Sequence, residues 1–498
     1  MPTKIDATQL WLLSPQLSVV LLGILVLAVD LLGRRRRLTW LTALVGLAVP
    51  AILVAALAFQ WFVPVTLPAT AFFGTLVVDQ FTLFFLVLFL VVGLGVILVS
   101  YEYAEKYLRA TPGEFYSIIL FSLAGMMMIA ASGELITLYI SYELMSIPLY
   151  MLAALMRNDT RSQEAGLKYI LLGAMSSAIL LYGMALIYGA TGTTSLPEIA
   201  TATANVLKSG NLLLVVGEIF IFTGLGFKVS AVPFHMWAPD IYEGSPTPST
   251  LFFSIGSKAA GFAALLRIFA FGGLAAIDSS TLWVIVAVVA ALTMTLGNVV
   301  ALLQTNIKRM MAYSSIGQAG YILVGFAALL KGVTGVGSLG MLTFIFVYVV
   351  TNIGVFAGII ALGDATGRES VRDFDGFGRR APGMAAGMSL CLLALAGIPP
   401  MAGFLSKLFI FVAAWYEGGF MTFLVVLGLI NSAISLVYYT NVTWRMYSIT
   451  PEKRERIQTP TGVKLTMALA VVGIFVLTIA FGFLAQAGAA DILPVAAK

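Results

Sequence analysis

Long apolar runs separated by short polar gaps fill almost the whole sequence. A helix of about 20 residues crosses the ~30 Å hydrocarbon core of a bilayer, and each run is about that long or longer. The ~10-residue alternating segments of a membrane β-barrel do not occur in the sequence. The pattern therefore predicts an all-α integral membrane protein. Fourteen spans are predicted, near residues 10–32, 38–63, 77–101, 115–131, 135–156, 164–190, 212–238, 247–271, 281–303, 307–330, 338–362, 383–416, 420–446 and 463–485.

The composition supports a membrane protein, because 60% of the 498 residues are hydrophobic and only 10% are charged. Twenty of the 28 Lys and Arg residues lie in gaps that follow odd-numbered spans. These are Arg34, Arg35, Arg36, Arg37, Lys106, Arg109, Arg157, Arg161, Lys168, Lys308, Arg309, Arg368, Arg372, Arg379, Arg380, Arg445, Lys453, Arg454, Arg456 and Lys464. The positive-inside rule then predicts that these gaps face the cytoplasm and that both termini lie outside. The net charge of +5 belongs to these loops and does not indicate nucleic-acid binding.

Only five basic residues fall in the other gaps and termini: Lys4, Lys208, Arg267, Lys331 and Lys498. The remaining three, Lys228, Lys258 and Lys407, lie inside predicted spans. A charged side chain at the bilayer centre costs roughly 2.5–3.5 kcal/mol on insertion scales, and such residues usually mark ion pathways. The three lysines therefore predict a route for charge through the membrane.

Two spans contain sequences that interrupt a helix. Span seven carries Gly224, Gly226 and Pro233, and span twelve carries the run Gly-Ile-Pro-Pro-Met-Ala-Gly at 397–403. Proline removes a helix hydrogen bond, so both spans are predicted to break near mid-membrane. Helices broken at this depth form the binding sites of many transporters. The alternative is a pair of kinks that serve only helix packing.

The two interrupted spans are five apart, and an odd offset reverses the direction across the membrane. Spans 4–8 and 9–13 are therefore predicted to be inverted repeats. The corresponding division is an N-terminal three-helix region, two antiporter-like repeats and a C-terminal helix, at 1–110, 111–275, 276–446 and 447–498.

Glu143 is the acid placed deepest in its span, about 12 Å along the helix. A buried acid and amine stabilise each other's charged forms, so a switchable pair of Glu143 with Lys228 is predicted to control whether Lys258 holds its proton. A static ion pair is the alternative, and it leaves two lysines unmatched. His235 is predicted to satisfy backbone groups freed by the span-seven break, with a gating or relay role as the alternative.

Polar side chains recur near the lysines and are predicted either to hold water or to make ordinary interhelical hydrogen bonds. They are Ser254, Ser257, Ser406, the stripe Ser314, Gln318 and Tyr321, and the stripe Asn431, Ser435 and Tyr438. Three acids near span ends, Asp30, Asp79 and Glu134, are expected to reach the membrane interface. Glu164 and Lys168 are expected to form a solvated i,i+4 pair.

One cysteine and one histidine, Cys391 and His235, are too few for a disulfide, an iron–sulfur cluster, a zinc site or a bis-His haem. The sequence also lacks a GxxxxGK[ST] motif and a GxGxxG motif after a strand. The sequence therefore predicts no metal site, redox centre or nucleotide site of its own.

Three stretches resemble the antiporter-like N subunits of bacterial proton-pumping NADH:quinone oxidoreductase, respiratory complex I. They are GFKVSAVPFHMWAPDIYEGSPTP at 226–248, IKRMMAYSSIGQAG at 307–320 and AGIPPMAGF at 396–404. The resemblance implies two inverted five-helix repeats, broken helices seven and twelve, and a proton route through Glu143, Lys228, Lys258 and Lys407. The sequence departs from twofold symmetry, because span ten has no acid matching Glu143 and span thirteen has no lysine matching Lys258.

The resemblance further implies a bacterial plasma membrane location and a partnership with other complex I membrane subunits. These partners include neighbouring antiporter-like subunits and a lateral helix from a sister subunit, with NADH, FMN, iron–sulfur clusters and quinone bound elsewhere in the assembly. Two other functions fit the same sequence: a subunit of a multisubunit cation/proton antiporter, and a passive scaffold that joins neighbouring subunits.

Overall fold

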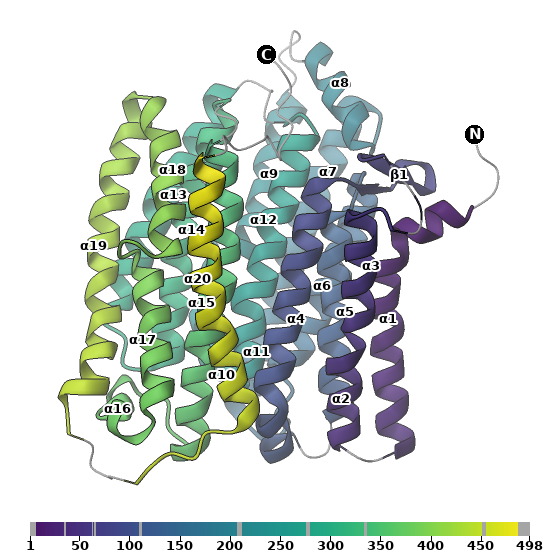
Figure 1. The fold of residues 1–498 in the computed structure, drawn as a ribbon. Helices are drawn as coiled ribbons and strands as arrows, with labels where there is room; N and C mark the ends of the chain where they lie inside the picture. The colour runs from purple at the N-terminus through teal and green to yellow at the C-terminus, as the bar shows by residue number, and fades with distance from the viewer. Residues whose placement is uncertain are drawn as a thin grey trace.

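A computed structural model describes residues 6–33, 36–61, 63, 66–108, 112–206, 212–274, 279–332, 336–450 and 455–486. The helices run side by side from one end of a bundle to the other, and the start of α1 and the end of α20 lie at the same end (Figure 1). The elements are α1 (Ala7–Gly33), α2 (Arg36–Gly46), α3 (Ala48–Ala58), β1 (Ala69–Ala71), η1 (Phe72–Gly74), β2 (Leu76–Val78), α4 (Gln80–Tyr107), α5 (Pro112–Ala130), α6 (Leu135–Ala153), α7 (Thr160–Thr191), α8 (Leu196–Val206), α9 (Leu212–Val229), α10 (Trp237–Gly244), α11 (Thr247–Phe252), η3 (Phe253–Ser257), α12 (Lys258–Leu266), η4 (Arg267–Phe271), α13 (Ser279–Ala301), α14 (Ile307–Leu330), α15 (Val336–Thr366), η6 (Val371–Phe374), α16 (Phe377–Arg380), α17 (Pro382–Ala396), α18 (Ala402–Tyr416), α19 (Gly419–Ser448) and α20 (Thr461–Gln486).

The predicted all-α membrane fold is confirmed. Among the described residues, 13 helical segments are long and apolar enough to cross a membrane. Two shorter apolar helices, α17 and α18, occupy the predicted twelfth span. The innermost segments are those at Thr247–Phe271, Ile307–Leu330 and Gly337–Thr366, which are 94–100% buried. These three segments form the centre of the bundle.

Small elements fill two of the gaps. β1 and β2 form an antiparallel hairpin in which Thr70 pairs with Val77. Leu76 then bridges to Ser132 in the turn between α5 and α6. The hairpin and α8 lie at one end of the bundle, and α16 lies at the other (Figure 1). The pattern of apolar runs that predicts the spans does not reveal these short segments.

The seventh span is interrupted between α9 and α10. Helical geometry stops at Val229, and Ser230 adopts a left-handed backbone conformation with φ of 61°. Trp237 donates from Nε1 to the Phe227 carbonyl at 2.8 Å, and the Val232 amide donates to Thr293 Oγ1 at 2.9 Å. Two residues that the sequence analysis did not single out, Trp237 and Thr293, therefore satisfy two freed backbone groups at this break.

The twelfth span is interrupted between α17 and α18. Gly397 ends α17 in the left-handed region, with φ of 84°, and its amide donates to the carbonyls of Leu393 and Ala394. A glycine in this conformation is the common way for a helix to end, because it lacks the Cβ that makes the left-handed region costly. The chain then passes through Pro399 and Pro400 before α18 begins at Ala402.

The eighth span is also irregular. Its helix widens into π-helical turns at η3 and η4, which flank the α-helical segment that begins at Lys258. Single π turns inside α-helices are frequently found at functional sites. They leave no strong mark in hydrophobic periodicity, and the sequence predicted only a span near 247–271 here.

Two basic residues in or beside the polar gaps are buried, which the sequence did not reveal. Arg267 is 2% exposed, and its guanidinium makes two hydrogen bonds to the Asp79 carboxylate, at 2.6 and 3.1 Å. Lys308 is 3% exposed and pairs with Glu369 at 2.8 Å. A charge that finds a partner inside the protein need not reach the surface, and the sequence does not reveal which partner the fold will supply.

The Arg267–Asp79 pair ties three elements together. Asp79 also caps α4, since its carboxylate accepts from the Thr82 amide at 2.7 Å, and Arg267 donates to the Ala130 carbonyl at the end of α5 at 2.9 Å. The guanidinium lies 4.7 Å from the ring centre of Phe81 and 4.4 Å from that of Phe271. Asp79, which was expected to reach the interface, instead anchors η4 to the N-terminal helices. The i,i+4 pair of Glu164 with Lys168 is confirmed at 2.7 Å.

Replacing Arg267 by Met should lower the free energy of unfolding by about 3–5 kcal/mol, because it leaves the Asp79 carboxylate without its buried partner. The matched control is Arg157→Met, because the Arg157–Glu114 pair is 3.8 Å long and the arginine side chain is 80% exposed. This control should cost less than about 1 kcal/mol. Unfolding of the two purified variants by heat or denaturant measures the difference, and equal losses would contradict the assignment.

Replacing Gly397 by Ala should destabilise the protein by about 1–2 kcal/mol, the cost of the left-handed region for a residue with a Cβ. The added carbon would also lie 3.1 Å from Cδ of Lys407, which must then shift. Gly189→Ala in α7 is the control, because a Cβ there meets nothing within 4 Å and the backbone is helical. Thermal unfolding should separate the variants; an unchanged midpoint for Gly397→Ala would refute this role of the glycine.

Candidate proton-transfer site

The three predicted lysines are buried in the bundle, and each finds a different environment. Lys228, Lys258 and Lys407 are 0%, 2% and 4% exposed. An isolated ammonium group in an apolar interior is very costly, so each environment must supply electron-rich groups or allow the amine to lose its proton. The nature of those groups indicates what each lysine can do.

Lys258 is bound to α14. Its Nζ donates to the Ser315 carbonyl at 2.7 Å and also to the Ser315 hydroxyl. The Tyr242 hydroxyl lies 3.3 Å from the same serine oxygen. An amine, an alcohol and a phenol therefore share one buried cluster. Once the amine is neutral, each of the three groups can both donate and accept a hydrogen bond.

Lys407 lies at the break of the twelfth span. Its Nζ donates to the carbonyls of Leu395 and Ala396, both at 3.1 Å, and lies 4.6 Å from the ring centre of Tyr321. These carbonyls are at the C-terminal end of α17, where the helix dipole is negative and stabilises a cation. The break therefore provides the ammonium group with its solvation.

Lys228 lies at the end of α9 among aromatic rings. Its Nζ is 5.0 Å from the ring centre of Tyr142, 5.6 Å from that of Tyr150 and 5.5 Å from that of Tyr169. No hydrogen-bond partner within the described residues meets this amine. The face of an aromatic ring attracts a cation more weakly than a carboxylate does. The ammonium form of Lys228 is therefore the least stabilised of the three.

The predicted switchable pair of Glu143 with Lys228 is open in this structure. Among the described residues, no carboxylate lies within 4.0 Å of the Lys228 amine. Glu143 instead accepts a hydrogen bond from the Ser177 hydroxyl, which lies 3.0 Å from the Tyr139 hydroxyl. The carboxylate and the amine interact electrostatically across the gap between α6 and α9. The structure thus contains the separated arrangement of a pair whose closed arrangement would need a side-chain movement.

Glu143 also lies beside an exposed apolar face of α6. Its neighbours Ile140, Leu144 and Ile147 are 61%, 39% and 53% exposed. The acid therefore lies between the protein interior and a lateral surface. His235 is half-buried in the break between α9 and α10. It takes no part in the hydrogen bonds described for the lysines.

Hydrogen bonds bridge much of the distance between Lys258 and Lys407. Ser314, next to Ser315 in the chain, is hydrogen-bonded to the Tyr439 hydroxyl. Gln318 donates to that hydroxyl and to the Leu395 carbonyl, both at 3.1 Å. Leu395 in turn accepts from Lys407. Ser314 and Gln318 of the predicted polar stripe are therefore joined through Tyr439, which the sequence analysis did not name. This group adjoins Ser315 along the chain at one end and shares the Leu395 carbonyl with Lys407 at the other.

The other stripe residues form a separate branch. Tyr321 accepts from Asn298 Nδ2 at 3.1 Å, and the Tyr438 hydroxyl donates to Asn298 Oδ1 at 3.0 Å. Asn431 bonds to Thr295 at 3.2 Å, while Ser435 bonds to the Ser432 carbonyl at 2.7 Å. Ser254 and Ser406 bond to carbonyls of their own helices. For these residues the structure shows ordinary interhelical and intrahelical hydrogen bonds.

A small cavity adjoins Lys407. It is lined in part by Gln318, Tyr348 and Ser406, and it has room for about one water molecule. A water molecule there would have the amide, the hydroxyls and the amine as partners. The cavity therefore lies where a mobile proton carrier would complete the connection between Gln318 and Lys407.

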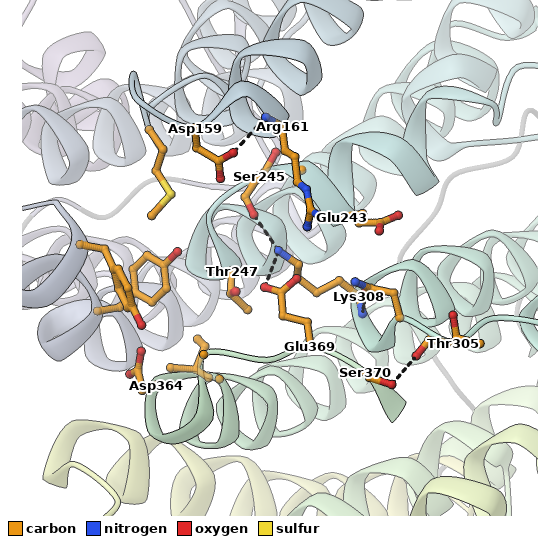
Figure 2. Close-up of a pocket in the computed structure, with 18 residues that line it drawn as sticks. Asp159, Arg161, Glu243, Ser245, Thr247, Thr305, Lys308, Asp364, Glu369 and Ser370 are labelled. Carbon is orange, nitrogen blue, oxygen red and sulfur yellow. Dashed lines mark hydrogen bonds and ion pairs between the residues drawn. The ribbon is translucent and has the colours of Figure 1, made fainter. Parts of the chain in front are cut away.

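A larger polar cavity of about 530 Å³ opens at the end of the bundle where the odd-numbered gaps meet. Figure 2 shows Lys308 in this cavity, with its amine between Glu369 and the Ser245 carbonyl. Ser315 lies seven residues beyond Lys308 on α14, which is about 10 Å along the helix. Tyr242 lies three residues before Ser245 and bonds to Ser315. The cavity therefore comes close to the Lys258 cluster from one side of the membrane.

Among the residues that the structure describes, no cluster of three or more His, Cys, Asp or Glu side chains could hold a metal ion. Cys391 is a buried free thiol.

Residues 132–435 match the family model described as "NADH:quinone oxidoreductase/Mrp antiporter, TM". The chain is 44% identical to the NADH-quinone oxidoreductase subunit N of Desulforamulus reducens over 83% of its length and 84% of the relative's. It is 43% identical to the subunit N of Moorella thermoacetica, over 94% of its own length and 95% of that relative's.

A solved structure supports the same relationship. A chain of respiratory complex I from Thermus thermophilus, determined with bound aureothin, superposes with a TM-score of 0.78 and 29% sequence identity. The match covers 96% of this chain and 100% of that one. The similarity in sequence and in fold extends over nearly the whole length of the chain. The chain therefore belongs to the family of NADH-quinone oxidoreductase N subunits, within the NADH:quinone oxidoreductase/Mrp antiporter membrane proteins.

Proposed function

We propose that this chain translocates protons across the bacterial plasma membrane, as a subunit of an NADH:quinone oxidoreductase whose redox chemistry occurs in other subunits. The observation that carries the proposal is a pair of hydrogen-bonded groups that meet at adjacent serines of α14. Lys258 bonds to Ser315, while Ser314 and Gln318 share the Tyr439 hydroxyl. Gln318 and Lys407 both donate to the Leu395 carbonyl, so water must complete the route for a proton. Buried amines joined by polar groups are what a proton relay requires and what a purely structural bundle would avoid.

Lys258 is the proposed central carrier. It receives a proton from the polar cavity by way of Tyr242 and Ser315, and passes it towards Tyr439 through hydroxyl groups and water. Lys407 is the proposed terminal carrier, because the carbonyls at the end of α17 stabilise its ammonium form and no ion pair with a carboxylate holds it within the described part of the chain. Moving one charge against 100 mV costs about 2.3 kcal/mol, so a signal from the redox subunits must drive the step.

Lys228 and Glu143 are proposed to carry that signal. The stem of Lys228 packs against α12 at Gly261, one turn from Lys258, where a Cβ would lie 3.4 Å from Lys228 Cβ. Closing the pair of Glu143 with Lys228 would compensate the Lys228 charge and favour a proton on Lys258. Opening the pair would restore the repulsion between the two amines and favour release. His235, at the adjacent break, is proposed to have a secondary role in gating.

The assembly that surrounds the chain follows from the same proposal. Glu143 borders an exposed apolar face, which we assign to contact with a neighbouring membrane subunit; a lateral helix from a sister subunit is a further proposed partner. NADH, FMN, iron–sulfur clusters and quinone belong to other subunits. The loops after odd-numbered spans are placed in the cytoplasm and both termini outside, although Arg34, Arg35, Arg109, Lys453, Arg454 and the terminal residues lie outside the described residues.

The proposal retains the division into two inverted repeats, 111–275 and 276–446, between an N-terminal region at 1–110 and a C-terminal helix at 447–498. The boundaries at 110/111 and 275/276 lie outside the described residues. Each repeat contains one interrupted span and one buried lysine beside the break, Lys228 in the first and Lys407 in the second.

A cation/proton antiporter subunit is the second candidate, favoured by the family description, which includes the Mrp antiporters. Purification of the assembly in which the chain resides separates the two. NADH:quinone activity in that assembly supports the first candidate, and an assembly with no redox-active subunit supports the second.

Replacing Lys258 by Met keeps the length of the side chain and removes its exchangeable proton. We expect proton transfer through this chain to slow by roughly a hundredfold or more, as for loss of a positioned acid–base group. The measurement is proton pumping coupled to NADH oxidation by the assembled complex in vesicles. Lys331→Met is the control, because Lys331 is partly exposed and pairs with Glu417 at 3.3 Å, away from the relay.

The control should pump as the wild type does. Wild-type pumping by Lys258→Met, in a complex that remains intact and oxidises NADH, would show that the chain is a passive scaffold.

A further inference from the structure

A groove on the lateral surface runs between α17 and α20 and has no part in the proposed proton route. It has a volume of about 680 Å³. In Figure 1 the two helices lie next to each other on the side of the bundle, and their first turns are at the end occupied by α16. For the rest of the text, the α17–α20 groove means the surface lined by residues 380–390 and 456–472 of these segments.

One end of the groove is basic. Arg380, Arg456 and Lys464 line it, and no Asp or Glu side chain is among its lining residues. Among the described residues, none of the three cations has a carboxylate within 4.0 Å; Arg380 Nε donates only to the Glu455 carbonyl, at 3.4 Å. Three cations clustered around a hollow, with no ion-pair partner among the described residues, create a positive potential that favours an anion.

Two helix N-termini reinforce the positive potential at that end. α17 begins at Pro382 and α20 at Thr461, and both helices are long, with 15 and 26 residues. The unpaired amide groups and the dipole of a helix N-terminus attract negative charge. Here they act together with the three cationic side chains at the mouth of the groove.

The rest of the groove is apolar and follows the membrane-spanning direction. Its wall is formed by Met384, Leu390, Met467, Val471 and Val472, and Val472 is 57% exposed. Gly383 leaves open space, since a Cβ built on it meets nothing within 4 Å. A free inorganic anion would use only the basic end; the apolar channel below it fits a hydrocarbon chain.

We propose that the α17–α20 groove binds an anionic phospholipid. The phosphate group lies among Arg380, Arg456 and Lys464, and an acyl chain lies along the apolar wall past Gly383. All three cations belong to gaps after odd-numbered spans, so the lipid is in the leaflet on the side where those gaps meet. Basic pockets between membrane helices are a recognised form of lipid recognition. The site does not depend on proton transfer.

The test uses the assembled complex in mild detergent and a phosphatidylglycerol with a photoactivatable diazirine in its acyl chain. Cross-linked peptides from 382–390 and 463–472 report occupancy. Phosphatidylcholine with the same modified chain is the second probe, and inorganic phosphate is a competitor. We expect labelling of these peptides by phosphatidylglycerol, weak labelling by phosphatidylcholine and no displacement by phosphate.

Two variants remove the site in independent ways. The triple variant Arg380→Gln, Arg456→Gln and Lys464→Gln should weaken labelling on the order of a hundredfold, since each cation near a membrane surface contributes about fivefold. Gly383→Leu should block the acyl channel while the three cations remain. The matched controls are the triple variant Arg37→Gln, Arg157→Gln and Arg372→Gln, which removes the same charge elsewhere, and Gly189→Leu, where the added side chain also meets open space.

Retained labelling in either groove variant would overturn the proposal. So would equal labelling by the two lipids, or displacement by phosphate, which would show a site for a free anion. Protein cross-links from a neighbouring subunit to this surface, in place of lipid labelling, would show that another chain covers it.

Discussion

The cost of an ammonium group in an apolar interior governs how the elements around the three buried lysines are built. Transfer of such a charge from water is prohibitive unless the protein supplies compensating groups, or unless the amine becomes neutral. Each lysine receives a different kind of compensation. Lys407 has two backbone carbonyls, Lys258 has a serine carbonyl and hydroxyl, and Lys228 has the faces of tyrosine rings. The graded strength of these contacts makes the sites unequal, and a directed transfer of protons needs unequal sites.

The broken helices follow from the same constraint. An unbroken helix uses all its inner carbonyls for its own hydrogen bonds and has none for a cation. By ending α17 at Gly397, the chain frees the carbonyls of Leu395 and Ala396 for Lys407. At the other break, Trp237 donates to the Phe227 carbonyl, and the Lys228 amine lies among aromatic rings instead. One type of interruption thus produces a well-solvated amine at the second break and a poorly solvated one at the first.

The features that could be predicted from the sequence are those that depend on a single segment of the chain. Apolar run length locates the spans, and Pro399, Pro400 and Pro233 locate the interruptions, because proline acts on its own helix. The three lysines stand out because their neighbours are apolar. A switchable pair of Glu143 with Lys228 was predicted from charge alone. The hydrogen bond that the acid makes with Ser177 in the open arrangement depends on how α6 and α7 pack.

The parts that sequence could not predict depend on the rotation of one helix against another. Tyr439 bridges Ser314 and Gln318 only because α19 presents that tyrosine to α14, and one residue of rotation would present Tyr438 instead. Arg267 and Lys308 look like loop charges until the fold brings Asp79 and Glu369 to them. The α17–α20 groove joins segments about 80 residues apart and has no pattern of its own in the sequence.

The central claim is that Lys258 and Lys407 exchange protons through the polar link at Gln318, and the ratio of protons pumped to NADH oxidised tests it directly. Gln318→Leu leaves every lysine in place and removes the hydrogen bonds to Tyr439 and to the Leu395 carbonyl. Gln16→Leu in α1 is the control, since Gln16 is another buried glutamine, 1% exposed, distant from the relay in sequence. The account predicts a reduced ratio for Gln318→Leu in an intact complex and an unchanged ratio for Gln16→Leu. An unchanged ratio for Gln318→Leu would contradict it.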